Sequence, residues 1–312
     1  MKIIRINDVE LEGTGGIRGG TGHHARRILN SEVLNRDPDA LDNFYFGVSY
    51  VGKGEFHTPR HRHDFSQYRY MIEGEADYHV GELQTGGVLN YSPEGAYYGP
   101  QKDGAGIMVN CQFADASGNG FFGRKQVKEA TEALKARNEG VFKDGLYTRN
   151  PGVPGKPVQD SNEAIFEFMR GRPVIYPPTG YLHTILINSN GIPWMPIEGL
   201  TGVEEKDMGT FGLCRYKVAR YKIDPGATFV AKGRGVYFVL SGTGSVEGEL
   251  FEDHTTTYLE EGEEATFSAE RTTDILFYGL PTLSAIKKAS AALRALQEEL
   301  EATPAQETEA AE

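Results

Sequence analysis

The sequence predicts an all-β protein made of two antiparallel barrels, with a few helices at their periphery. Short segments rich in aromatic and β-branched residues recur in two blocks, 47–113 and 216–281, and turns containing glycine or proline separate these segments. The 39 glycines follow no triplet period, so they indicate many tight turns rather than a collagen helix. At 312 residues, of which 39% are hydrophobic, the chain is long enough to fill two cores.

In both blocks short predicted strands alternate with turns, as is typical of a small barrel or jelly roll. The first block predicts strands at 44–51, 68–72, 76–80, 88–91 and 107–113, with turns at 73–75, 86–87 and 93–95. The second block predicts strands at 211–223, 236–240, 244–250, 256–259, 265–267 and 275–278. Because the two blocks share strand order and glycine turns, we interpret them as a weak internal repeat.

Helical periodicity appears outside the blocks, at 124–137 and at 161–170, where Ser161 is the expected N-cap. A third helix is expected at 284–300, packing its apolar stripe against a barrel or a partner subunit. That stripe contains Ile286, Leu293, Leu296 and Leu300. We therefore divide the chain into a first barrel, a helix-containing connection, a second barrel, and a helix followed by an acidic, disordered tail. Their ranges are 1–120, 121–200, 201–283 and 284–312.

Charge and composition exclude several classes of function. A formal net charge of −12 argues against a nucleic-acid partner, because phosphate binding needs a basic face. No run of eighteen apolar residues occurs, so no membrane span is predicted, and the N-terminus lacks the apolar core of a signal peptide. Cys111 and Cys214 are too few for a disulfide framework and fit a reducing compartment. We expect a cytoplasmic protein.

The stretch 57–67 holds the strongest candidates for chemistry. His61 and His63 are two residues apart, so on an extended strand both imidazoles point to the same side and can reach one ion. Neutral imidazole binds iron, manganese, nickel, copper and zinc. The alternative, that these are surface or hydrogen-bonded histidines, stays open at this point. His57 shares their parity. His23 and His24 follow the glycine-rich stretch 13–22 and are expected in a mobile surface loop, whereas His79, His183 and His254 have no ligand-spaced neighbours and are interpreted as ordinary strand or turn residues.

These residues resemble the motifs of the cupin superfamily. The first motif, H-x-H-x3-E-x6-G, is matched in spacing by His61, His63, Gln67 and Gly74. The second motif, G-x5-P-x-G-x2-H, is matched in spacing by Gly87, Pro93, Gly95 and Tyr98. The resemblance covers 47–113 well and 216–281 only by its turns. It implies two cupin barrels of the double-stranded β-helix type and a homodimer or higher homo-oligomer.

Two of the four metal ligands that the resemblance implies are replaced. Gln67 stands at the glutamate position and offers a neutral carbonyl oxygen, and Tyr98 stands at the position of the last histidine. A phenol has a pKa near about 10 and must lose its proton to bind well, which ferric iron favours more than a divalent ion does. The expected metal is therefore iron, with manganese as a second candidate, and a metal-free site stays open.

One subgroup of the superfamily is more similar still. His61-Arg62-His63, with Arg69 six residues after His63 and Gly74 beyond it, resembles the gentisate and salicylate ring-cleaving bicupin dioxygenases. The resemblance implies that Arg69 binds the carboxylate of a substrate, and strand parity places Arg69 on the face of His61 and His63. The alternative is that Arg69 pairs with a glutamate on the barrel rim: Glu55, Glu73 or Glu75.

The function we expect is that of a metal-dependent enzyme, an oxygenase that acts on a small organic or aromatic acid. His61, His63, Gln67 and Tyr98 would be its metal ligands, Arg69 would orient the anionic substrate, and Phe65 and Met71 would form apolar walls. Two alternatives stay open: a bicupin that binds a small molecule without catalysis, and a metal-free isomerase or lyase with Tyr98 as acid and a histidine as base. The segment 227–234 has no ligand-spaced histidine or carboxylate, so the second barrel is expected to be structural.

Overall fold

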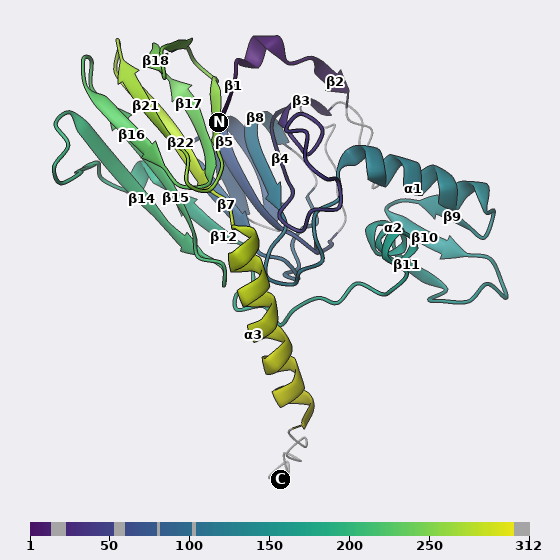
Figure 1. Cartoon of the computed structure of the whole chain (residues 1–312). Helices are drawn as coiled ribbons and strands as arrows, with labels where there is room; N and C mark the ends of the chain where they lie inside the picture. Colours follow the sequence, from purple (N-terminus) through teal and green to yellow (C-terminus); the bar gives the residue numbers. More distant parts are fainter. Residues whose placement is uncertain (14–22, 53–59, 80–81, 102–103, 303–312) are drawn as a thin grey trace.

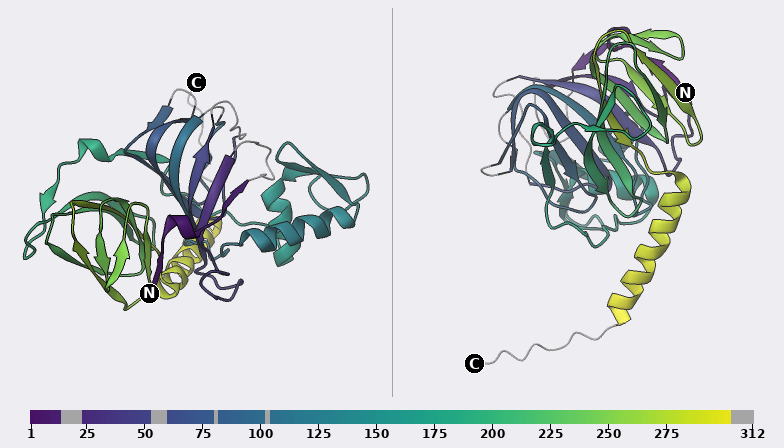
Figure 2. Two further views of the ribbon diagram at one scale, coloured as in Figure 1. Left: turned by 90° about the horizontal axis from the view of Figure 1, so that it is seen from above. Right: turned by 90° about the vertical axis from the view of Figure 1, so that its left-hand side faces the viewer.

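The computed structural model describes residues 1–13, 23–52, 60–79, 82–101 and 104–302, whose strands form two barrels lying side by side (Figure 1). All strand pairs in both barrels are antiparallel, which confirms the all-β prediction. The view from above shows the second barrel as a ring of strands beside the first (Figure 2). His57 and the tail 303–312 lie outside the described residues.

The large sheet of the first barrel has the strand order β12-β7-β5-β8-β4-β3-β2, and β6 pairs with β5. The bounds of its strands are β2 Leu11–Gly13, β3 His23–Leu29, β4 Phe44–Val51, β5 Ser66–His79, β6 Glu82–Thr85, β7 Val88–Ser92, β8 Gly104–Phe113 and β12 Ile185–Asn188. His24 therefore lies in a strand, not in the surface loop that the glycines before it suggest.

The large sheet of the second barrel has the order β1-β20-β17-β22-β15-β14-β13, and a small sheet with the order β16-β21-β18-β19 lies beside it. The large sheet consists of β1 Lys2–Ile4, β13 Met195–Pro196, β14 Val203–Phe211, β15 Tyr216–Ile223, β17 Gly235–Ser241, β20 Thr256–Leu259 and β22 Thr273–Gly279. The small sheet consists of β16 Thr228–Lys232, β18 Gly244–Val246, β19 Glu249–Phe251 and β21 Glu264–Ala269. The repeat predicted from the glycine turns is thus a repeat of topology.

The two barrels exchange one edge strand each. β1 precedes the first barrel in the chain but pairs with β20 of the second, Ile3 lying opposite Thr257. β12 precedes the second barrel but pairs with β7 of the first, Ile187 lying opposite Leu89. The division at residues 120 and 200 stays a prediction, and these two strands cross it.

The remaining elements lie at the periphery. Helices α1 Arg124–Ala136 and α2 Ser161–Arg170 pack on a three-stranded sheet and project from the first barrel (Figure 1). That sheet consists of β9 Gly140–Lys143, β10 Leu146–Arg149 and β11 Val158–Asp160, and two short 3-10 helices lie at Ile6–Asp8 and Ser189–Gly191. Helix α3 Leu283–Ala302 leaves the body between the barrels (Figure 2). Its Ile286 and Leu293 are buried against residues that follow β8, as the apolar stripe predicts.

Three local expectations are wrong, each for a physical reason. The predicted turn at 73–75 is part of the continuous strand β5: a register shift in the pairing with β8 lies between Met71 and Glu73, and Gly74, at φ +88°, follows it and stays paired with Gly106. The predicted strand 211–223 is a hairpin instead, since the chain reverses at Gly212 between β14 and β15. The N-cap of α2 is Asp160, whose side chain accepts a hydrogen bond from the Asn162 backbone N–H at 2.8 Å.

The large sheets of the two barrels pack face to face through an aromatic layer. Phe46 of β4 contacts Phe238 of β17 with 5.7 Å between ring centroids, and Tyr68 of β5 stacks on Tyr278 of β22 at 5.1 Å. The first barrel supplies to this layer Phe44, Phe46, Tyr68, Tyr91 and Phe113, and the second supplies Phe211, Tyr216, Phe238, Tyr258 and Tyr278. Because one hydrophobic core spans both sheets, the barrels form a single packed body.

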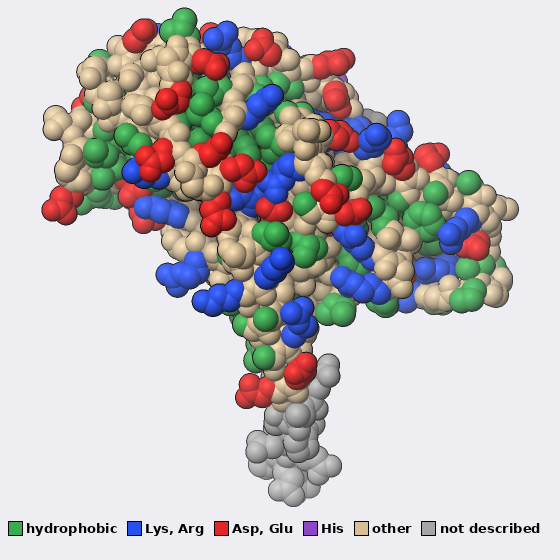
Figure 3. Space-filling model, in the orientation of Figure 1, with side chains coloured by type: hydrophobic (Ala, Val, Ile, Leu, Met, Phe, Trp, Pro, Cys, Tyr) green, Lys and Arg blue, Asp and Glu red, His purple; other side chains and the backbone are tan. Residues whose placement is uncertain are grey.

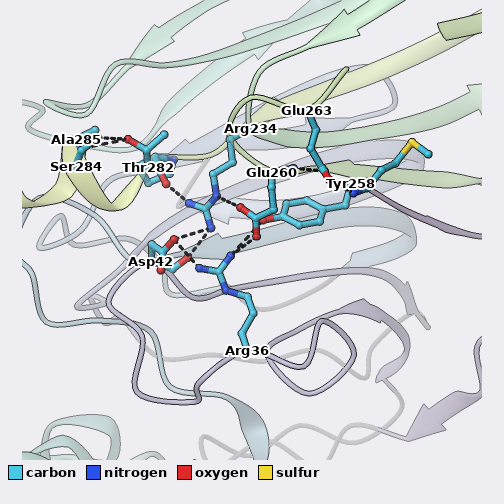
Figure 4. Close-up of polar contacts among 11 residues, drawn as sticks. Arg36, Asp42, Arg234, Tyr258, Glu260, Glu263, Thr282, Ser284 and Ala285 are labelled. Atoms are coloured by element: carbon cyan, nitrogen blue, oxygen red, sulfur yellow. Dashed lines mark hydrogen bonds and ion pairs between the residues drawn. The ribbon is translucent and has the colours of Figure 1, made fainter. Parts of the chain in front are cut away.

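A buried ionic network also joins the barrels (Figure 4). Arg234, at the start of β17, has a side chain only 3% exposed and forms ion pairs with Asp42 at 3.1 Å and Glu260 at 3.2 Å. It also donates to the backbone oxygens of Asp42 and Pro281, the latter just before α3. Arg36 binds the same two carboxylates from the other side, at 2.6 and 2.5 Å. The network therefore connects a loop of the first barrel, the second barrel and the base of α3.

The surface is mixed in charge. Acidic and basic side chains are interspersed over the barrels on the face that Figure 3 shows. Among the described residues, none of the helices combines the length and the apolar composition that a membrane crossing requires.

Candidate functional site

The interior of the first barrel is lined by polar side chains because alternate residues of its strands face opposite ways. On β5, Tyr68 and Tyr70 belong to the core shared with the second barrel, while Met71 belongs to a separate interior cluster. Gln67 and Arg69 share the parity of Met71 and lie opposite Gln112 and Asn110 of β8. This barrel therefore encloses amides and a guanidinium where a purely structural barrel would hold apolar residues.

His61, His63 and Tyr98 converge in this interior, as the motif spacing predicts. The backbones of His61 and Tyr98 pair in an antiparallel bridge, with N–H to oxygen distances of 3.0 and 2.9 Å. The Tyr98 hydroxyl lies 2.9 Å from His61 Nε2 and 3.2 Å from His63 Nε2. The three side chains are 5%, 7% and 2% exposed, which excludes the interpretation of the two histidines as surface residues.

Gln67 and Arg69 form a second polar group beside these rings. With its amide oxygen toward Arg69, Gln67 accepts hydrogen bonds from Arg69 Nε at 2.7 Å and Nη2 at 3.2 Å. Its amide also lies 2.6 Å from the Gln112 amide, and Arg69 Nη1 donates to Gln101 Oε1 at 3.1 Å. The guanidinium carbon of Arg69 is 5.6 Å from the centre of the Tyr98 ring. Gln67 thus contacts Arg69, and its place in a ligand set stays a prediction.

No ion pair joins Arg69 to a carboxylate among the described residues, where its polar partners are amides. The rim pairing with Glu73 or Glu75 therefore does not form, and Glu55 lies outside the described residues. Because these amides are neutral, they do not offset the positive charge of the Arg69 guanidinium, which is left to attract an anion.

The two apolar residues expected as walls occupy different places. Phe65 stacks on His63, with 4.3 Å between ring centroids and 23° between planes, and its other neighbour is Phe121. Met71 is buried in the interior cluster with Val51, Ala76 and Met108. Phe65 therefore packs against the His63 ring, whereas Met71 belongs to the apolar part of the barrel interior.

The donor set fits a transition-metal ion. Consider two ligands that each lie about 2.1 Å from one ion. If the ligand–ion–ligand angle is between a right angle and the tetrahedral angle, the two ligand atoms are about 3.0–3.4 Å apart. The Tyr98 hydroxyl is 2.9 Å from one imidazole nitrogen and 3.2 Å from the other, so the phenol oxygen has the spacing of a cis ligand to each imidazole. No group of three or more His, Cys, Asp or Glu side chains that could hold a metal ion occurs among the described residues, so a metal here would depend on the phenol. Two imidazoles and one oxygen also leave positions open for a substrate.

The corresponding part of the second barrel is filled with side chains. On β16 and β21, Phe229 lies opposite Phe267 and Ala231 opposite Ala265, all of them buried in one apolar cluster. Tyr237 and Phe277 stack within the same cluster, with ring centroids 4.5 Å apart. His254 lies outside it, stacked on Phe238 of the aromatic layer. Only the first barrel, of the two, has a polar interior among the described residues.

Sequence reasoning missed Gln101 and Gln112, which hold Arg69 and Gln67. Gln112 could have been found from the parity of β8, because Met108, Asn110 and Gln112 alternate with the apolar residues of the shared core. Gln101 follows a loop and no periodicity marks it.

No protein-family model and no curated protein sequence matches the chain. Solved structures do resemble it. A protein of Geobacillus kaustophilus superposes with a TM-score of 0.52 at 12% identity, covering 90% of this chain and 95% of that chain. A proposed dioxygenase of Nostoc punctiforme gives 0.54 at 11% identity, covering 91% and 83%. Oxalate decarboxylase of Bacillus subtilis gives 0.51 at 15% identity, covering 89% and 76%. At these identities the likeness establishes the fold, that of the two-barrel cupins.

Proposed function

We propose that the first barrel is a metal-dependent cupin enzyme that acts on a small organic acid, with oxygenase chemistry as its reaction class. The convergence of His61, His63 and the Tyr98 hydroxyl within one buried site carries this proposal. Iron is the proposed ion, and manganese is the second candidate, because two imidazoles and a phenol suit either. The relatives in fold include a proposed dioxygenase and an oxalate decarboxylase, and this likeness supports the fold, not the reaction.

Different residues of the chain would hold the ion and bind the substrate. His61, His63 and Tyr98 would hold the ion, which when bound supplies charge stabilisation for the reacting group. Arg69, held by Gln67 and Gln101, would bind the carboxylate of the substrate and orient it beside the Tyr98 ring. Phe65 fixes the His63 ring from its outer side. In this arrangement Gln67 positions Arg69.

A metal-free acid–base enzyme is the second candidate. The observation that favours it is the 2.9 Å hydrogen bond between Tyr98 and His61, since a phenol and an imidazole in contact can transfer a proton. A non-catalytic binding protein is the third. The metal content of the protein separates the first candidate from both others.

Protein purified without chelators is expected to contain about one first-row metal ion per chain by element analysis. Apoprotein that is reconstituted anaerobically should take up Fe(II) or Mn(II) to the same level. If the purified protein is metal-free and the apoprotein holds neither ion, the metal-dependent form of the proposal is wrong.

Replacing Arg69 with alanine is expected to weaken binding of a small carboxylate by about one to two decades. The reason is the loss of charge-assisted hydrogen bonds, which contribute roughly 1.5–3 kcal/mol. Arg69→Lys should restore only part of the affinity, because a point charge does not reproduce the planar fork. Titration calorimetry on acids selected by thermal shift measures the effect.

Two controls accompany this experiment. The methyl ester of each acid should bind poorly to the wild type, and Arg62→Ala should bind the acid normally, since the Arg62 guanidinium carbon lies 3.5 Å from the centre of the Tyr176 ring. Equal affinity for acid and ester, or an unchanged Arg69→Ala, would show that the substrate is not held as an anion.

A further inference from the structure

A second cavity, of about 390 Å³, lies between the first barrel, the β14–β15 turn and helix α3. A volume of this size is typical of small-molecule sites. Its walls come from five separate segments: the end of β7 with the residues after it, the residues after β8, the loop 177–181, the turn at Gly212 and Leu213, and α3. None of its lining residues belongs to the imidazole and phenol cluster described above.

The polar end of this cavity is acidic. Glu94 and Asp115 both line it and are only 6% and 3% exposed. Asp115 accepts hydrogen bonds from the Ser66 hydroxyl at 2.5 Å, the Ala116 backbone N–H at 2.7 Å and the Tyr216 hydroxyl. Every oxygen of Asp115 is therefore paired within the protein.

Glu94 is only half paired. Its Oε1 accepts a hydrogen bond from the Ser117 backbone N–H at 2.7 Å, while its buried Oε2 has no hydrogen-bond partner among the described residues. Burial and the nearby Asp115 raise the pKa of Glu94 well above its ordinary value. A buried carboxyl oxygen without a partner is costly, so this atom is where a ligand would gain most.

The rest of the cavity is apolar and contains no positive charge. Pro177, Pro178, Leu213, Leu293 and Leu296 line it, and no lysine, arginine or histidine does so among the described residues. Leu296, on α3, is 41% exposed and lines the cavity. The cavity thus has an acidic end and an apolar body.

We propose that this cavity binds an organic cation with an apolar body, an alkyl- or arylalkylammonium ion. Its ammonium group donates to Glu94 Oε2, and its positive charge stabilises the ionised form of this carboxyl group, which burial and Asp115 disfavour in the free protein. Its hydrocarbon part lies between the prolines of the loop 177–181 and the leucines of α3. This site is separate from the proposed metal centre, so either proposal can fail without the other.

The test is calorimetric titration of full-length protein in phosphate buffer with three probes of matched shape. These are 2-phenylethylammonium, 2-phenylethanol and 3-phenylpropanoate. The ammonium ion is expected to bind at least about tenfold more tightly than the alcohol or the acid, because only the cation forms a charge-assisted bond to the carboxyl group. Equal binding of all three, tighter binding of the alcohol or the acid, or binding of none overturns the proposal.

Two variants locate the site. Glu94→Gln, which keeps an acceptor for Ser117, should weaken ammonium binding by about tenfold or more. Leu296 is partly exposed on α3, and alanine at this position is compatible with the helix. Leu296→Ala should therefore weaken binding several-fold, through the loss of apolar contact with the ligand. The matched controls Glu249→Gln and Leu250→Ala, on exposed β19, should bind normally. Normal binding by Leu296→Ala, or by a folded Glu94→Gln, would show that the cation binds elsewhere.

Discussion

Protein in which both His61 and His63 are replaced with alanine is expected to bind no Fe(II) or Mn(II) at concentrations that saturate the wild type. The two imidazoles are the nitrogen donors of the site, and a phenol with neutral amides beside it cannot hold a divalent ion alone. Metal titration with element analysis after gel filtration measures this loss. The proposed metal centre predicts no larger effect for any other pair of residues.

Weaker effects are expected from the oxygen donor and from the control. Tyr98→Phe keeps the ring but removes the hydroxyl, and should weaken metal binding less than the loss of both imidazoles does, because nitrogen donors bind these ions more strongly than a protonated phenol. His254→Ala should change nothing, because His254 stacks on Phe238 in the aromatic layer. Full metal occupancy in the double histidine variant would place the ion elsewhere in the protein.

Replacement of Arg234 with alanine is expected to destabilise the protein by about 2–4 kcal/mol, through the loss of several buried charge-assisted hydrogen bonds. This side chain is 3% exposed, pairs with Asp42 and Glu260 and donates to the backbone oxygens of Asp42 and Pro281, so its removal leaves those oxygens without this donor and Arg36 as the remaining partner of the two carboxylates. In a chain of this size such a loss should lower the midpoint of thermal unfolding by about 5 °C or more. Differential scanning calorimetry or circular dichroism measures the shift.

Lys232 provides the matched control, two residues away. Lys232→Ala removes an ion pair with Glu264 in which both side chains are more than half exposed, so the expected cost is about 0–1 kcal/mol. If Arg234→Ala and Lys232→Ala have equal effects, the network between the barrels contributes no more than an ordinary surface pair.

Much of the fold could be predicted because the signals that carry it are local. Strands 44–51 and 256–259 agree with β4 and β20, since alternation and flanking turns mark their ends. His61, His63 and Tyr98 also lie together, as the motif spacing predicts, but not for the reason of strand parity: His61 forms an isolated bridge with Tyr98, and His63 precedes β5. The solved relatives in fold support the two-barrel prediction over most of the chain.

What could not be predicted depends on contacts between distant segments. The exchange of β1 and β12 leaves no trace in periodicity, because each strand has the same pattern whichever sheet it joins. Arg234 and Glu260 look like surface charges in the sequence, and only the packing of the barrels buries the arginine. Likewise, Gln67 has the spacing of a metal ligand, while its contact with Arg69 depends on side-chain geometry that spacing does not encode.

The exchanged edge strands also constrain how the chain reaches its folded state on the ribosome. β1 is synthesised about 250 residues before β20, the strand beside which it lies, so its backbone groups stay unpaired while the first barrel forms. The first barrel in turn lacks its own edge strand until β12 emerges, which leaves β7 open to pairing with another chain. The first barrel can therefore close once β12 has emerged, before the second barrel is made, whereas the second barrel is completed only by a strand from the start of the chain. The second barrel synthesised alone, from residue 201 onward, would present the uncovered edge of β20 and its half of the aromatic layer to solvent, and should aggregate rather than persist as a monomer.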